Sequence, residues 1–207
     1  MPRYNLGINQ MDVLSGRPHE LSAQLLQSVE QYRYKVFVEM LGWELDTPPG
    51  RERDQFDHAG TLYLAARDAK QEIVGTARLL PTTSPYLLSE VFPQLLGGAT
   101  PPCDPLVWEL SRFAAVDFTA TGQGAMGQFS SPVAVGLLEE AIAVARAHGV
   151  QRMITVSPLG IERLLRREGF RAHRAAPPVI VDGHPLFACW IEVTDRTPPP
   201  PRRPAVH

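Results

Sequence analysis

Glu109, Ser111 and Arg112 interrupt an otherwise apolar stretch, Leu106–Ala115, that has the length and composition of a core strand. Such a strand buries charged side chains only when they have a partner or a function. In strict alternation, Glu109 and Ser111 face one side and Arg112 the other, but a bulge near Ser111 would bring Glu109 and Arg112 together. Because bulges cluster beside active sites, the stretch predicts a carboxylate, a hydroxyl and a cation around a reacting centre. The alternative is a Glu109–Arg112 ion pair at a strand edge.

A second group of reactive side chains lies in segment 42–57, which is polar and rich in Gly and Pro and therefore predicts a long loop. The Trp43 ring could stack on a planar or cationic group, and the Asp54 and Asp57 carboxylates could hold an amine or a sulfonium. Alternatively, Trp43 fills the core and the two Asp residues cap turns. Arg78 lies among apolar residues, which favours a clamp for a carboxylate over a solvated edge charge.

The elements that must position these side chains follow from hydrophobic periodicity and turn residues. Apolar spacing predicts helices at 21–40, with Ser22 as N-cap, at 132–148 and at 160–168, and one helical turn around 89–96. β-rich runs predict an antiparallel hairpin of 61–67 with 72–80, strands at 106–115 and 151–157, and a closing hairpin of 179–181 with 185–193. The Gly-rich connector at 117–127 either offers backbone N–H groups to a phosphate or is a bare turn.

Composition limits the class of protein. The 207 residues predict a single domain, 1–196, followed by a Pro-rich tail, 197–207. A net charge of −2 excludes a strongly basic nucleic-acid binder on global charge. Cys103 and Cys189 form no CxxC motif and the six histidines are scattered, so we expect neither a disulfide framework nor a metal site. Without a signal pattern or an apolar run of about 20 residues, we expect a soluble, cytoplasmic protein that binds no membrane.

Two local patterns suggest further surfaces. Segment 146–174 carries seven arginines against two glutamates, a local charge of +5, which predicts a docking face for an acidic partner or, alternatively, a solvated helix face. In strand 151–157, Met153, Thr155 and Ser157 share one face, which fits a lined cavity or an exposed edge.

At ten positions, taken in order, the sequence resembles the LuxI-type acyl-homoserine-lactone synthases, the enzymes that make the autoinducers of bacterial quorum sensing. The resemblance runs from about residue 24 to 193 and includes YRYKVF at 32–37, LGW at 41–43, DQFD at 54–57, GTARLLP at 75–81 and WELSRF at 108–113. The matched positions are Arg33, Phe37, Trp43, Asp54, Asp57, Arg78, Phe92, Glu109, Ser111 and Arg112.

This resemblance implies a GNAT-like α/β fold, in which a mixed, twisted sheet flanked by helices splays into a V-shaped cleft. It implies synthesis of an N-acyl-L-homoserine lactone from S-adenosyl-L-methionine and an acyl thioester on acyl carrier protein, with release of methylthioadenosine. S-adenosylmethionine would be a substrate and no cofactor is expected. Acyl carrier protein is acidic, which would explain the basic segment. We expect a monomer.

The implied roles fall into four sets. Glu109, directly or through a water, is the expected base, Ser111 orders the strand around it, and Arg112 completes the catalytic set. The expected adenosylmethionine pocket comprises Arg33, Phe37, Trp43, Asp54, Asp57, Arg78 and Phe92, with Arg112. Candidates for the acyl-chain pocket are Met126, Met153, Thr155 and Ser157. Candidates for carrier-protein docking are Arg146, Arg152, Arg163, Arg166 and Arg167.

Other functions fit parts of the sequence. A GNAT-type N-acetyltransferase acting on a small amine would share the fold but leave the 42–57 loop unexplained. A non-catalytic ligand-binding module would leave Glu109, Ser111 and Arg112 unexplained. A methyltransferase that uses adenosylmethionine is disfavoured because no Gly-rich loop directly follows an early strand in this sequence. The connector at 117–127 departs from the pyrophosphate loop of coenzyme A-dependent relatives, which fits a carrier-protein donor but leaves coenzyme A open.

Overall fold

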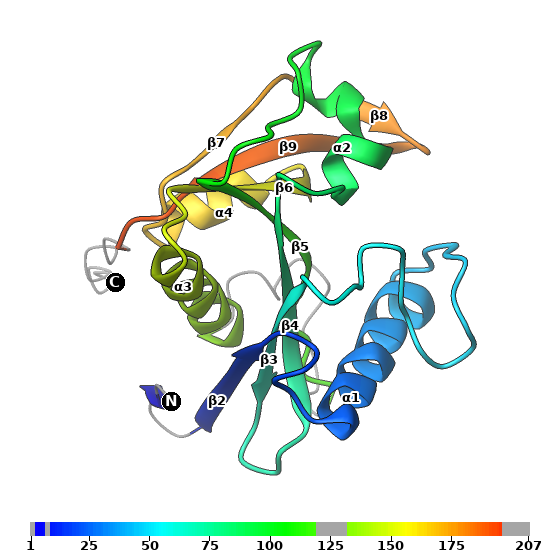
Figure 1. Ribbon diagram of the computed structural model, residues 1–207, viewed down its shortest axis with the longest axis vertical. Helices are drawn as coiled ribbons and strands as arrows, with labels where there is room; N and C mark the ends of the chain where they lie inside the picture. The colour runs from blue at the N-terminus through cyan, green and yellow to red at the C-terminus, as the bar shows by residue number, and fades with distance from the viewer. Residues whose placement is uncertain (1–2, 7–8, 119–131, 196–207) are drawn as a thin grey trace, which may run out of the picture.

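One mixed sheet organises the chain in the computed structural model, which describes residues 3–6, 9–118 and 132–195 (Figure 1). Its path of neighbouring strands is β1-β2-β3-β4-β5-β6-β9-β7, and β8 also pairs with β9. The strands are β1 (Arg3–Leu6), β2 (Asn9–Gly16), β3 (Leu62–Arg67), β4 (Ile73–Pro81), β5 (Val107–Ala114), β6 (Arg152–Pro158), β7 (Ala172–Arg174), β8 (Val179–Val181) and β9 (His184–Glu192). The helices are α1 (Ala23–Arg33), α2 (Leu87–Val91), α3 (Pro132–Ala147) and α4 (Ile161–Arg167), with a π-helical turn η1 (Tyr34–Met40) and a 3-10 turn η2 (Pro93–Leu96).

The sheet divides at the β5–β6 pair. These two strands run parallel and pair only over residues 107–109 of β5, whereas their neighbours in the sheet are antiparallel. Beyond Glu109, β5 continues along β4 and β6 continues along β9, so the two strands part. A V-shaped opening therefore begins beside Glu109, as the family resemblance implied.

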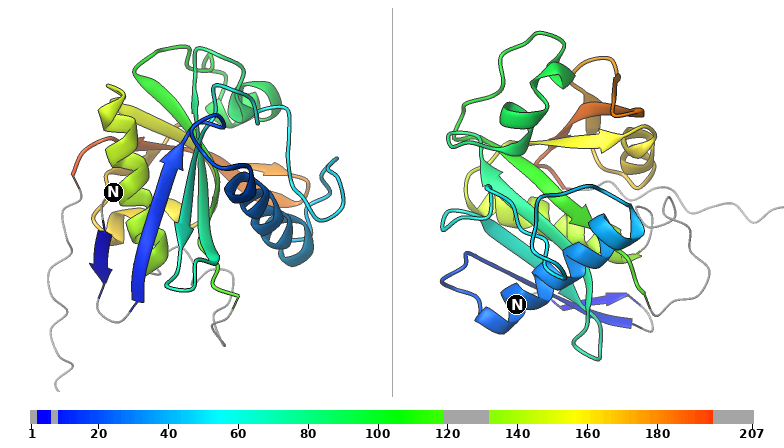
Figure 2. Two further views of the ribbon diagram at one scale, coloured as in Figure 1. Left: turned by 60° about the horizontal axis from the view of Figure 1, so that its bottom comes forward. Right: turned by 90° about the vertical axis from the view of Figure 1, so that its right-hand side faces the viewer.

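Helices cover both sides of the sheet (Figure 2). On one side, α3 and α4 lie over a continuous apolar core that includes Met153 and Phe187. On the other side, α1 and η1 pack near β4, while α2 and η2 lie over a second core that includes Leu80 and Ile154. Because neighbouring side chains on a strand alternate between these two sides, β5 reaches both of them.

The close packing of α3 against the C-terminal end of β5 depends on Gly75 of β4. A Cβ placed on Gly75 of β4 would lie 3.2 Å from both the Ala114 carbonyl oxygen and a methyl group of Leu137. Both contacts are tighter than ordinary van der Waals packing, so a larger residue would push apart β4, β5 and α3. Glycine at this position lets the helix and the end of β5 pack closely.

Most predicted elements are present. The two hairpins, the strands at 106–115 and 151–157, the helices at 132–148 and 160–168 and the turn near 89–96 are confirmed within a few residues. Helix 21–40 begins as predicted, because Ser22 Oγ accepts from Leu25 N at 3.2 Å, but its second half is the π-helical η1. The strands β1, β2 and β7 were not predicted, and β7 has only three residues.

Two predicted segments fall mainly or wholly outside the described residues: most of the Gly-rich connector, 117–127, and the Pro-rich tail, 197–207. Within the described part of the chain, no helix is long and apolar enough to cross a membrane.

Candidate active site

Six charged side chains alternate in sign around a closed ring beside β5, which we call the charge ring. Its members, in order of contact, are Arg33, Glu52, Arg112, Asp54, Arg78 and Asp57. The three arginines project from α1, β5 and β4, whereas the three carboxylates all come from the loop before β3. Each arginine lies between two carboxylates and each carboxylate between two arginines, so the ring fastens the loop to the rigid elements.

The distances are those of strong, charge-assisted hydrogen bonds. Arg33 binds Asp57 through both Nη atoms, at 2.8 and 2.9 Å, and binds Glu52 through Nε. Arg78 binds Asp54 through both Nη atoms, at 2.5 and 3.0 Å, and its Nη1 lies 3.1 Å from Asp57. This clamp confirms the prediction that Arg78 holds a carboxylate.

The Arg112 guanidinium completes the ring. Its Nη2 lies 2.8 Å from Asp54 Oδ2 and 3.0 Å from Glu52 Oε1, and its Nε donates to the same Glu52 oxygen at 3.1 Å. The ring contains three arginines and three carboxylates, so its formal charges cancel.

Burial and pairing act against each other on the ionisation of these groups. Burial alone would raise the pKa of Asp57, but Arg33 and Arg78 outweigh it and hold that pKa well below its usual range. The Tyr63 hydroxyl donates to Asp57 Oδ1 at 2.8 Å, and burial together with the Asp57 charge raises the pKa of Tyr63. Asp57 therefore stays ionised across the physiological range.

The predicted bulge in β5 is confirmed. Ser111 lies opposite Arg78, but Ala114 lies opposite Thr76, so β5 has one extra residue between these two pairs. The backbone of Arg112 has a φ of +50°, which lies in the left-handed region that residues other than glycine rarely adopt. The bulge turns the Arg112 side chain to the side of the sheet that carries Arg78, and Ser111 Oγ accepts from Arg78 Nε at 3.0 Å.

A stacked aromatic pair lies against the ring. The Phe37 and Trp43 rings are 4.8 Å apart at an interplanar angle of 26°, and the Arg112 guanidinium lies 5.5 Å from the first and 5.9 Å from the second. Phe37 lies in the π-helical η1, and the Phe37 carbonyl oxygen accepts a hydrogen bond from Trp43 N at 2.9 Å. Trp43 is 45% exposed, so the interpretation that it fills the core is wrong.

The alternative interpretation of the loop carboxylates, that they cap turns, is confirmed, while binding to an amine or a sulfonium stays a prediction. Asp54 Oδ1 accepts from Phe56 N at 2.9 Å and Asp57 Oδ2 accepts from Asp54 N at 2.8 Å, so both residues also cap turns. The Asp57 side chain is buried, whereas the Asp54 side chain is 19% exposed. Asp54 is therefore the better placed of the two to meet a ligand.

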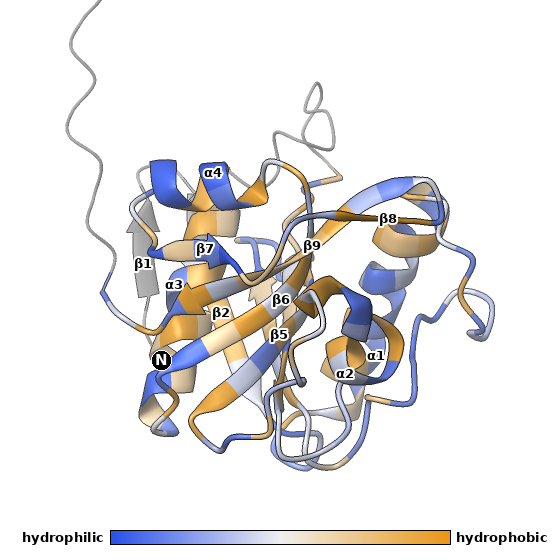
Figure 3. Cartoon of the chain, turned by 90° about the horizontal axis from the view of Figure 1, so that it is seen from above, coloured by the Kyte–Doolittle hydropathy of each residue, from blue (hydrophilic) through white to orange (hydrophobic). Residues whose placement is uncertain are grey.

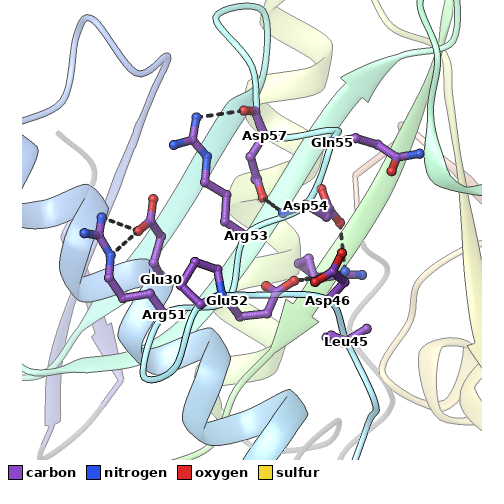
Figure 4. Close-up of a pocket in the computed structure, with 11 residues that line it drawn as sticks. Glu30, Leu45, Asp46, Arg51, Glu52, Arg53, Asp54, Gln55 and Asp57 are labelled. Carbon is purple, nitrogen blue, oxygen red and sulfur yellow. Dashed lines mark hydrogen bonds and ion pairs between the residues drawn. The ribbon is translucent and has the colours of Figure 1, made fainter.

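A pocket of about 700 Å³ opens over the ring (Figure 4). Its walls come from Glu30 of α1, from the loop between Leu45 and Asp57, and from Arg112. This volume suits a molecule of nucleoside size. Four members of the ring, Glu52, Asp54, Asp57 and Arg112, line the pocket. Within the described residues, no cluster of His, Cys, Asp or Glu could hold a metal ion.

Glu109 lies on the same side of the sheet, at the start of the opening between β5 and β6. Its side chain is fully buried, and its two oxygens accept from Leu87 N at 3.1 Å and from Leu88 N at 2.7 Å. These bonds cap the first turn of α2. Burial raises the pKa of Glu109, although the two N–H groups and Arg78 act in the opposite direction. No ion pair between Glu109 and Arg112 is present among the described residues, so the predicted alternative of a strand-edge pair does not apply.

Known proteins resemble this chain in sequence and in fold. The family model described as autoinducer synthase matches residues 18–197. The acyl-homoserine-lactone synthase of Acinetobacter nosocomialis is 55% identical over 183 residues, covering 88% of this chain and all of the relative. The chain belongs to the autoinducer synthase family. It is an acyltransferase that makes an acyl-homoserine lactone.

Solved structures agree. A crystal structure of TofI in a ternary complex with an inhibitor and MTA has a TM-score of 0.77 and 41% identity, covering 90% of this chain and 94% of that one. The coenzyme A-dependent synthase BjaI, solved with SAM and isopentyl-CoA, has a TM-score of 0.75 and 28% identity, covering 90% and 84%. An N-acetyltransferase structure from Lactobacillus plantarum, at 18% identity, covers 89% and 99% with a TM-score of 0.60. The expected GNAT-like fold is thereby confirmed.

The predicted acyl-chain residues of this synthase lie apart from the ring. Met153, Thr155 and Ser157 share one side of β6, as predicted, and are buried on the side covered by α3 and α4. Met126 falls outside the described residues. Phe92 packs against the second core beside η2, and its expected place in the adenosylmethionine pocket stays a prediction.

The predicted docking arginines of this synthase are only partly brought together. Arg163, Arg166 and Arg167 are exposed on α4, and Arg146 is exposed at the end of α3. Figure 3 shows the hydrophilic stretches of α4 and β7. We call the exposed arginines of α4 and of the segment after it the basic face: Arg163, Arg166, Arg167, Arg171 and Arg174. Arg152 lies on the opposite side of the sheet, stacked 4.7 Å from Trp190, and is not part of this face.

The sequence interpretation missed Glu52 and Tyr63, which both bind ring members. Glu52 is fully buried although it lies in a polar loop. The alternation Arg51, Glu52, Arg53, Asp54 resembles an ordinary solvated stretch, and only the burial of its acidic members distinguishes it.

Proposed function

We propose that this chain acylates the amine of S-adenosyl-L-methionine with an acyl group from acyl carrier protein and then closes the lactone, releasing methylthioadenosine. The observation that carries the proposal is the pocket lined by Glu52, Asp54, Asp57 and Arg112 of the charge ring, together with the Phe37–Trp43 pair, which lies against the same Arg112 guanidinium. The stacked rings suit a sulfonium or a purine. The relative TofI was solved with MTA and the relative BjaI with SAM, which supports the same substrate here.

The first step is N-acylation. The amine loses a proton and attacks the thioester carbonyl carbon, the carbonyl oxygen becomes an oxyanion, and the thiolate leaves with a proton. Glu109 is our candidate base, acting through a water, because it lies at the start of the β5–β6 opening and burial raises its pKa, which makes it a stronger base than an ordinary carboxylate. Our candidates for oxyanion donors are backbone N–H groups of β5 beyond Glu109, where β6 no longer runs beside this strand.

The second step is lactonisation. A carboxylate oxygen of the acylated substrate attacks its γ-carbon, and the C–S bond breaks to release neutral methylthioadenosine. Because the sulfonium is already a good leaving group, the protein mainly has to fold the substrate so that oxygen, carbon and sulfur align. In this scheme the ring and the aromatic pair hold the substrate, while Met153, Thr155 and Ser157 shape the acyl site.

The basic face supports a carrier-protein donor because acyl carrier protein is acidic. A coenzyme A donor is the second candidate, since the BjaI relative is described as coenzyme A-dependent. The test incubates purified protein with S-adenosylmethionine and either acyl carrier protein thioesters or acyl-coenzyme A of several chain lengths. Mass spectrometry should find acyl-homoserine lactone and methylthioadenosine in equal amounts, formed faster from the carrier protein. Acylated adenosylmethionine without methylthioadenosine would contradict the second step, and faster use of coenzyme A would overturn the donor assignment.

A further inference from the structure

We propose that Glu52 is a positioning residue, which closes the charge ring and thereby holds the Arg112 guanidinium, which lines the pocket, against the Phe37–Trp43 pair. The identity of the substrate in this inference rests on the proposed function, whereas the contacts of Glu52 do not depend on it. Glu52 has no part in the mechanism above, yet it is fully buried and contributes a wall of the pocket.

Glu52 connects three separate elements. Its Oε2 accepts from Arg33 of α1, its Oε1 accepts from Arg112 of β5, and its backbone N donates to the Glu30 carbonyl oxygen at 3.0 Å. Without the Glu52 carboxylate, the link between Arg33 and Arg112 is lost. The remaining ring members then form an open chain with Arg33 at one end and Arg112 at the other.

Arg112 is the ring member that most needs to be held. Its left-handed backbone is unfavourable for a residue with a side chain and persists only where its surroundings enforce it. Arg112 has two carboxylate partners, Glu52 and Asp54, and the second of these is partly exposed. Glu52 is therefore its fully buried anchor, and the stacking on Phe37 and Trp43 depends on the same guanidinium position.

The Glu52 charge also matters for the ligand. With Glu52 ionised, the ring has three positive and three negative members, so its charges cancel beneath the pocket. Neutralising Glu52 leaves a net charge of +1 beneath a substrate that itself carries a sulfonium and an amine against one carboxylate. Repulsion and a displaced Arg112 should both weaken binding of adenosylmethionine, while the acyl donor, which enters through the β5–β6 opening, is unaffected.

The test compares Glu52→Gln, which removes the charge at nearly constant shape, with Glu52→Asp, which keeps the charge at shorter reach. Glu44→Gln is the matched control, because Glu44 is an exposed carboxylate of the same loop. We expect Glu52→Gln to raise the KM for S-adenosylmethionine at least about tenfold and to leave the KM for the acyl donor within about twofold. Glu52→Asp should recover part of the loss, and Glu44→Gln should behave as wild type.

A crystal structure of Glu52→Gln supplies a measurement that does not depend on activity. Displacement of Arg112 from the Phe37–Trp43 pair supports the proposal, and an unmoved Arg112 overturns it. Equal rises in both KM values would also overturn it, since they indicate a general loss of structure. Calorimetry with wild type separates the two proposals: if wild type binds adenosylmethionine but forms no lactone, the proposed function fails, and the binding constants of the variants still decide the role of Glu52.

Discussion

The charge ring and the basic face contain the same kinds of residue in opposite settings. In the ring, each arginine is buried and lies between two carboxylates. On the basic face, the arginines are exposed, and those that pair do so mainly with nearby glutamates, as Arg174 does with Glu162 at 2.7 Å and Arg167 with Glu168 at 3.2 Å. Arginine content alone therefore does not separate a site that must be rigid from a surface that must stay available.

The difference is one of desolvation. A buried ion pair has lost its water, so removing one partner leaves an uncompensated charge at a cost of about 3–5 kcal/mol. An exposed pair is screened, and it contributes only about 0–1 kcal/mol. The ring can thus fix geometry at the pocket, whereas the basic face can exchange its internal partners for those of another protein at little cost.

Removing one cation from each region should give the largest contrast. Arg78→Met leaves Asp54 and Asp57 with one arginine fewer in the interior, and we expect it to lower the free energy of unfolding by about 3–5 kcal/mol. Arg174→Met, the surface control, should lower it by no more than about 1 kcal/mol. Urea unfolding followed by circular dichroism measures both. Similar losses for the two variants would break the distinction between ring and face.

Glu109 tests whether the side of the sheet that holds the ring also does the chemistry. Glu109→Gln should lower kcat by about 10²–10⁴ because the base is lost. The shape-conserving change is needed because Glu109→Ala would also leave the Leu87 and Leu88 N–H groups without their acceptor. In wild type, kcat/KM should fall as the pH drops through the raised pKa of Glu109, and this acid limb should vanish in the variant. Wild-type turnover in a folded Glu109→Gln would remove the base assignment.

The pH dependence of stability should also differ between the regions. Asp57 has a lower pKa in the folded protein than in the unfolded chain, so its contribution is fully present above about pH 4 and is lost as the pH falls toward the folded value. Between about pH 4 and pH 2, wild type should lose stability more steeply than Asp57→Asn, which starts lower but has no such charge. Thermal unfolding across this range measures the slopes. Parallel slopes would show that Asp57 does not couple folding to protons.

Particular residues show how far the sequence could predict this site. Glu109, Ser111 and Arg112 stood out because a strand should not bury them unpaired, and the bulge followed from the same conflict. The V-shaped opening came only from family resemblance, since nothing in the sequences of β5 and β6 states where their pairing stops. Glu52 was missed because its ring partners lie 19 and 60 residues away, so its burial depends on a tertiary arrangement that local pattern does not encode. Arg152 was assigned to the basic segment by sequence position, but strand alternation sends it to the other side.

The smallest expected effect concerns the basic face, and it is a change in recognition rather than in stability. Reversing Arg163, Arg166 and Arg167 to Glu changes the local charge by six units on an exposed helix, so folding should be nearly unaffected while an acidic carrier protein is repelled. We expect the KM for acyl carrier protein to rise about three- to tenfold, with the KM for S-adenosylmethionine unchanged. The increase should shrink as salt is added, because the interaction is screened over about 8–10 Å. Arg152→Glu, on the other side of the sheet, is the matched control and should leave the carrier-protein KM unchanged. If the triple variant keeps the wild-type KM, the carrier protein docks elsewhere. The basic face would then be only a solvated surface, in contrast to the charge ring, which fixes the structure.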